Sequence, residues 1–136
     1  YELEHLCHSL GVQCNFHGHL NASDKSVLIH DCHIAVIPSV ETVTGHTEGC
    51  PTVFLEYLSQ GVPVIASDTG GLKDLGVHMK NCILTEPGNP RSLTSAMSSL
   101  ETDSTLRNRI IESGYKTASR YDWRYITSVI RSKLSI

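Results

Sequence analysis

The chain has 136 residues, of which 40% are hydrophobic and 18% charged, and its formal net charge is −3. This length and composition are ordinary for one globular domain with its own core. A mildly acidic chain offers no broad basic surface, so nucleic acid is excluded as an expected partner. No apolar run approaches the length of a membrane span, and no signal peptide opens the chain.

The first residue is Tyr1 rather than Met, so we expect a piece of a longer protein. The five cysteines are widely spaced and include no Cys-x2-Cys pair. An odd number of separate thiols favours free cysteines in a reducing compartment, which is typical of the cytoplasm.

Helices and strands alternate along the chain in our interpretation. The expected helices are 1–10 before Gly11, 23–32 from Ser23, 51–60 before Gly61, 70–75, 90–100 after Asn89, 103–120 from Asp103 and 122–134 from Asp122. The expected strands are 12–17, 33–38, 63–66 and 82–85. Apolar strands that alternate with helices imply a parallel sheet with helices on both faces, which is the α/β class with a Rossmann-like architecture.

The last two expected helices carry apolar residues at helical spacing, and we expect both stripes to face the core. The stripes are Leu106, Ile110, Gly114 and Ala118 in one helix, and Trp123, Ile126, Ile130 and Leu134 in the other.

Most of the functional information lies in residues 48–71. Glu48 and Glu56 are eight positions apart around a Gly-x-Pro helix start, formed by Gly49 and Pro51. Pro51 suits the first position of a helix, where its missing N–H costs nothing, and Gly49 lets the backbone approach a ligand closely. The helix start leaves unpaired N–H groups and a partial positive charge, which favour phosphate.

A carboxylate has only acceptors when it is ionised, so it suits vicinal hydroxyls and repels phosphate. Glu48 and Glu56 can lie up to roughly 10 Å apart at the rise of a helix, which matches a nucleotide diphosphate sugar with hydroxyl groups at both ends. Taken alone, each glutamate is more often a solvated surface residue. The helix start between them and the Gly70-Gly71 pair beyond them favour the binding interpretation.

Segments along nearly the whole chain share one family pattern. The central ones are Ile37-Pro38-Ser39, Glu48-Gly49-Cys50-Pro51, Glu56, Gly61-Val62-Pro63-Val64-Ile65 and Gly70-Gly71. Supporting ones are Phe16-His17-Gly18, residues 80–89 and Tyr121-Asp122-Trp123. Together they resemble the donor half of retaining glycosyltransferases of the GT-B fold, family 4.

The resemblance implies that residues 1–136 form a single partial donor domain of a hexosyltransferase, the C-terminal half of a GT-B fold with its first two strands missing. Glu48 matches the catalytic glutamate that faces the donor sugar, and Glu56 matches the glutamate that binds the ribose hydroxyls. The backbone that touches phosphate or sugar falls on Gly49, Cys50, Pro51, Thr52 and Val53. The turn near the base falls on Leu20, Asn21 and Lys25, although Lys25 could equally be a solvated helix residue.

The implied substrate is a UDP-, GDP- or ADP-sugar, and no cofactor is implied. No Asp-x-Asp motif occurs, so no metal is indicated at the pyrophosphate. The acceptor, a glycan or a lipid, would bind through the missing N-terminal domain. The full enzyme is expected in the cytoplasm, where peripheral association with the inner face of a membrane is open to it.

Departures from the family pattern limit what this chain can do alone. The strand–helix unit whose basic residues hold the pyrophosphate is absent, so we expect no catalysis by the chain itself. The two missing strands belong between 12–17 and 33–38, so the sheet must leave a gap, pair these strands directly or borrow one. Tyr57, next to Glu56, could reshape the ribose pocket. Two alternatives stay open: another GT-B enzyme, such as a sugar-nucleotide epimerase or a phosphorylase, and a non-catalytic nucleotide-binding remnant.

Overall fold

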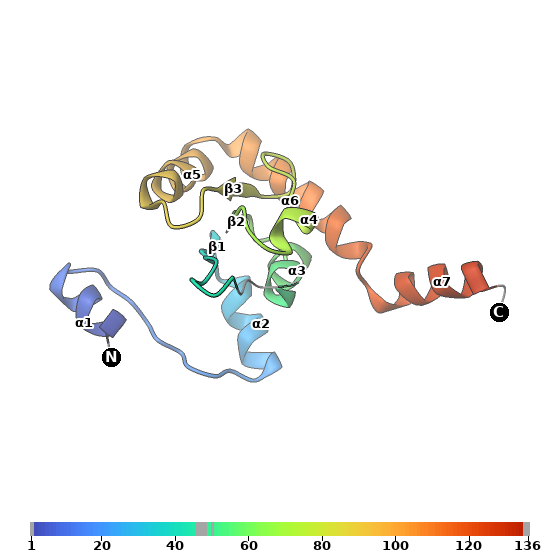
Figure 1. The fold of residues 1–136 in the computed structure, drawn as a ribbon, viewed down its shortest axis with the longest axis horizontal. Coiled ribbons are helices and arrows are strands. Elements are labelled where there is room, and N and C mark those ends of the chain that lie inside the picture. The colour runs from blue at the N-terminus through green and yellow to red at the C-terminus, as the bar shows by residue number, and fades with distance from the viewer. Residues whose placement is uncertain (1, 46–48, 50, 135–136) are drawn as a thin grey trace.

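The centre of the fold is a three-stranded parallel sheet in the order β1-β2-β3 (Figure 1). The computed structural model describes residues 2–45, 49 and 51–134. The strands are β1 (Ala35–Ile37), β2 (Val64–Ser67) and β3 (Ile83–Thr85). Val36 pairs with Ile65, and Ala66 pairs with Leu84. The expected α/β class with a parallel sheet is confirmed, and three of the four expected strands form.

Helices precede, follow and connect these strands. They are α1 (Glu2–Ser9), α2 (Ala22–His30), α3 (Thr52–Ser59), α4 (Leu72–Leu75), α5 (Pro90–Thr102), α6 (Ser104–Ser119) and α7 (Trp123–Leu134). The predicted starts of α5 and α6 are confirmed, because the Asn89 side chain accepts from the N–H groups of Arg91 and Ser92 and the Asp103 side chain accepts from that of Leu106. The predicted start of α2 at Ser23 is wrong. Asn21 caps this helix instead, and its Oδ1 lies 2.9 Å from the N–H nitrogen of Asp24.

The two faces of the sheet are covered by different helices. Phe54, Leu58 and Leu72 pack on one face, on the side of α2, α3 and α4, and Leu100 and Ile110 of α5 and α6 pack on the other. Residues of β2 are buried on both faces. The expected covering of both faces is therefore confirmed, and the first apolar stripe contributes to it.

The buried glycine of the first stripe brings α6 close to α3. A Cβ added at Gly114 would lie 3.0 Å from Cδ2 of Leu58, closer than almost all real contacts of this kind. Leu106 and Ile110 of the same stripe are buried, and Ala118 is half-buried. This stripe faces the core as predicted, so α6 holds in place the helix that carries Glu56.

The strand expected at 12–17 does not form. These residues run as an irregular segment between α1 and α2, and the Phe16 side chain is 50% exposed. A strand needs a neighbour for its N–H and C=O groups, and among the described residues β1 pairs only with β2. Of the three arrangements considered above, direct pairing of 12–17 with 33–38 does not occur.

The expectation that the second stripe faces the core is also wrong. Helix α7 forms with nearly the expected bounds, but none of its described residues is buried, and Trp123 is 78% exposed. Figure 1 shows α7 extending away from the sheet. The amphipathic pattern indicated the helix correctly, but the apolar side of α7 has no packed surface opposite it in the described part of the chain. No helix in this part is long and apolar enough to span a membrane.

Candidate functional site

The start of α3 is left open. Pro51 is the N-cap residue of α3, with φ −68° and ψ 108°, and not the first helical residue that the sequence predicted. No side chain caps the helix there. By contrast, a side-chain oxygen caps each of α2, α5 and α6. The N–H groups of Thr52 and Val53 lie in the first turn, where no helical partner exists. They find no other partner among the described residues, so the positive end of α3 is available to an anion.

Part of the predicted site cannot be placed. Glu48, the expected catalytic residue, and Cys50 lie outside the described residues. Gly49 is exposed, and a Cβ added there would meet nothing within 4 Å. Packing within the described chain therefore leaves room beside this backbone, as a close ligand approach requires.

Glu56 projects from the second turn of α3 and meets Lys25 of α2. The Lys25 Nζ lies 2.8 Å from Oε1 and 2.8 Å from Oε2 of Glu56. The Glu56 side chain is 33% exposed and the Lys25 side chain 42%. The structure thus brings together two predicted site residues that are 31 positions apart, and the Lys25 side chain is both paired and partly exposed to solvent.

The other residues expected near the base lie at the start of α2. Asn21 uses its side chain locally, because Oδ1 caps the helix and Nδ2 donates to Oδ2 of Asp24 at 2.8 Å. Leu20 is half-buried. The side-chain amide of Asn21 is therefore engaged, and base contacts from this turn would come from backbone groups.

Tyr57, the neighbour of Glu56, is engaged with the core. Its side chain is half-buried and packs against the core cluster between the sheet and α3. Burial raises the pKa of Tyr57, the charges of Cys32 and Glu56 add to this rise, and the charge of Lys25 opposes it. Tyr57 does not line the cavity beside Glu56, so it does not fill the predicted ribose site.

A cavity of about 510 Å³ opens beside Glu56, between α3 and the junction of α6 with α7. Thr52, Glu56 and Ser59 line it from α3, and Tyr121 and Trp123 line it from the opposite side. This volume lies within the range of ligand sites. No group of three or more His, Cys, Asp or Glu side chains within the described ranges could hold a metal.

Sequence reasoning did not place Tyr121 and Trp123 at the site. Both belong to the family pattern, and Trp123 also belongs to the apolar stripe expected to face the core. Their position follows from the turn between α6 and α7, which the sequence indicated through Asp122 but could not orient. The helical spacing of Trp123 with Ile126 and Ile130 was interpreted as a surface that faces the core.

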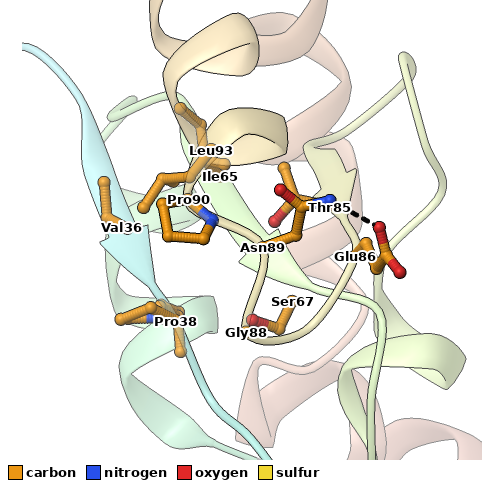
Figure 2. A pocket seen from close by; sticks show the side chains of 11 residues that line it. Val36, Pro38, Ile65, Ser67, Thr85, Glu86, Gly88, Asn89, Pro90 and Leu93 are labelled. Carbon is orange, nitrogen blue, oxygen red and sulfur yellow. Dashed lines mark hydrogen bonds between the residues drawn. The ribbon is translucent and has the colours of Figure 1, made fainter.

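A second, smaller cavity lies at the carboxyl ends of the strands, and sequence reasoning did not predict it (Figure 2). Ligands bind at this edge in many open α/β sheets. The cavity measures about 180 Å³, which is below the usual range for a drug-sized ligand. The start of α5 is already occupied by its Asn89 cap, whereas the start of α3 has no side-chain cap. The lining of the small cavity includes Val36, Ile65, Leu93, Ser67 and Thr85.

Comparison with known proteins gives a consistent result. The family model of the glycosyl transferases group 1 matches residues 1–117. An uncharacterized glycosyltransferase of Methanocaldococcus jannaschii is 32% identical over 124 residues, which is 89% of this chain and 30% of that protein. The glycogen synthase of Mycobacterium tuberculosis is 26% identical over 114 residues, 83% of this chain and 26% of that protein.

Solved structures show the same likeness. The crystal structure of Anabaena HepE in complex with UDP aligns with a TM-score of 0.84 and 28% identity, covering 98% of this chain and 36% of that chain. Its complex with UDP-glucose gives a TM-score of 0.80 and 26% identity over 98% of this chain and 36% of that chain. The chain therefore spans only about a third of the length of these relatives.

Proposed function

Since this chain belongs to the group 1 glycosyltransferases, we propose that it is the nucleotide-sugar-binding domain of an enzyme that transfers a hexose with retention of configuration. The observation that carries the proposal is Glu56. Its carboxylate borders a cavity of about 510 Å³ whose wall also includes Thr52, at the uncapped start of α3. The Glu56 carboxylate can accept hydrogen bonds from the ribose hydroxyls of a nucleotide, and the positive end of α3 can bind its diphosphate. Both groups lie on one helix.

The proposed mechanism is electrostatic. Thr52 and Val53 offer backbone N–H groups to the diphosphate, so the start of α3 stabilises the charge that grows on the departing phosphate. Glu56 holds the ribose hydroxyls, and Glu48 is assigned to the donor sugar, where its charge would stabilise the positive reacting carbon. HepE was crystallised with UDP and with UDP-glucose, which makes a UDP-sugar the first donor to test, before GDP- and ADP-sugars.

The whole enzyme requires more than this domain. We propose that a second domain binds the acceptor, a glycan or a lipid, and that the enzyme acts in the cytoplasm. The present chain should bind nucleotide without turning over a donor. Clear transfer by the isolated chain would contradict that part of the proposal.

Calorimetric titration with UDP, GDP and ADP tests the binding function. We expect one of the three to bind, and Glu56→Ala to weaken it by roughly 10- to 100-fold, since a hydrogen bond to a charged group contributes about 1.5–3 kcal/mol. Glu112→Ala is the matched control, because Glu112 is an exposed carboxylate on α6 outside the cavity. Failure of all three nucleotides to bind would favour a non-catalytic remnant, and equal binding by both variants would remove the ribose role of Glu56.

A further inference from the structure

The contact between Lys25 and Glu56 is symmetric. One ammonium lies 2.8 Å from both carboxylate oxygens, and it donates a hydrogen bond to Oε1. Oε2 is buried and accepts no hydrogen bond, so its charge is balanced only by the ion pair with the Lys25 ammonium. Within the described residues, no other cationic side chain pairs with Glu56. The orientation of this carboxylate therefore depends on Lys25.

The backbone that presents Lys25 is held at several points. Its N–H donates to the Asn21 carbonyl oxygen at 3.0 Å, inside the capped first turn of α2. One turn further on, Ile29 is buried in the core cluster. Between these points, the Ser26 hydroxyl donates to Oε1 of Gln60 at 3.3 Å, which ties α2 to the end of α3. Lys25 thus approaches Glu56 from an anchored helix and not from a loop.

The pair leaves room for a ligand. A carboxylate has about four lone-pair positions, and the single ammonium of Lys25 takes only part of them. Glu56 lines the cavity of about 510 Å³, whereas Lys25 does not. The ammonium holds the carboxylate from the α2 side and Oε2 is buried, so Oε1 is the oxygen left to accept from a donor in the cavity.

We propose that Lys25 is a positioning residue of the nucleotide site, and that it sets the preference for ribose through Glu56. This inference rests on the proposed function. Oε2 is buried, so ribose hydroxyls reach Glu56 through Oε1, and they can do so only if the carboxylate is held in one orientation. With its oxygens fixed by Lys25, Glu56 distinguishes a ribose diol from a 2′-deoxyribose. The sequence had placed Lys25 near the base, in direct contact with the nucleotide. A direct contact and a positioning role through Glu56 predict different effects of a Lys25 substitution.

Calorimetry on the 136-residue chain separates them. UDP, GDP and ADP are compared with their 2′-deoxy forms on wild type, Lys25→Met, Glu56→Gln and the double variant. We expect Lys25→Met to weaken the ribonucleotide by about tenfold, which is typical of directly coupled residues, and to change the deoxynucleotide by less than about twofold. In the Glu56→Gln background, Lys25→Met should change neither. Lys25→Arg retains a cation and should recover part of the ribose preference.

Other outcomes would overturn either the positioning role of Lys25 or the proposed function. If Glu56→Gln removes the ribose preference while Lys25→Met leaves it intact, the positioning role is wrong and the proposed function stands. If Lys25→Met weakens both nucleotide forms equally in both backgrounds, Lys25 contacts the ligand directly, which also overturns the positioning role. If no nucleotide binds to wild type, the proposed function itself fails.

A ligand-free measurement protects the test from a folding artefact. Urea unfolding of the same four proteins gives the coupling between positions 25 and 56 in the absence of nucleotide. A coupling near zero would mean that the pair does not form in solution, and the inference would fall. If Lys25→Met does not fold, Lys25→Gln carries the same comparisons with a side chain that stays polar.

Discussion

Gly61 ends the helix that carries Glu56, and its replacement by alanine tests the turn that connects α3 to β2. Its φ is +77°, a conformation that favours glycine. A Cβ added there would overlap Oη of Tyr115 on α6 and lie 2.8 Å from its Cζ. Gly61→Ala therefore faces two separate costs, one in the backbone and one against the tyrosine ring.

The two costs can be estimated from the structure. A left-handed backbone costs a residue with a Cβ about 1–2 kcal/mol, and overpacking costs about 1–3 kcal/mol. Tyr115 is 49% exposed, so its ring can turn outward, and the steric cost should fall at the lower end of its range. The sum is a loss of about 2–3 kcal/mol in the free energy of unfolding.

Urea unfolding followed by circular dichroism measures this loss, and the chain offers a matched control. Gly88 has a φ of +70°, but a Cβ there meets nothing within 4 Å. Gly88→Ala should therefore show only the backbone cost. In a Tyr115→Ala background, Gly61→Ala should cost no more than Gly88→Ala. If Gly61→Ala in the native background also costs no more than Gly88→Ala, Tyr115 does not lie against Gly61 and the reasoning is refuted.

Two further predictions concern single side chains. Burial raises the pKa of the Cys82 thiol to about 12 from an ordinary value of 9.0, so mass spectrometry should show iodoacetamide labelling Cys82 much more slowly than exposed Cys14 at about pH 8. Equal labelling rates would contradict the burial. Because the thiol ionises at a lower pH in the unfolded chain, the free energy of unfolding should fall as the pH rises between those two pKa values. Cys82→Ala should reduce that fall. Trp123, the single tryptophan, should show red-shifted fluorescence that acrylamide quenches readily, and a blue-shifted, protected emission would mean that α7 docks on another surface.

The elements that could be predicted are those whose signals are local. Asn89 followed by Pro90 predicts the start of α5, and the Asn89 oxygen does accept the first N–H groups. The strand expected at 12–17 failed for a different reason. Alternation and apolar content report which residues can pair in a sheet, but they do not report whether a neighbouring strand is present. The exposed Phe16 and the exposed stripe of α7 have the same origin, because a pattern indicates the face of an element and not the surface that covers it.

The candidate site also contains local features, which the sequence predicts, and contacts between distant segments, which it does not. The Gly-x-Pro start and the place of Glu56 in the second turn follow from residues within one short segment, so the sequence could predict them. The approach of Lys25 to Glu56 depends on how α2 lies against α3, and that depends on the burial of Ile29 and on the bond between Ser26 and Gln60. No local rule supplies such a contact. Spacing along the chain located the carboxylate, but only the packing of two helices identified the cation that pairs with it.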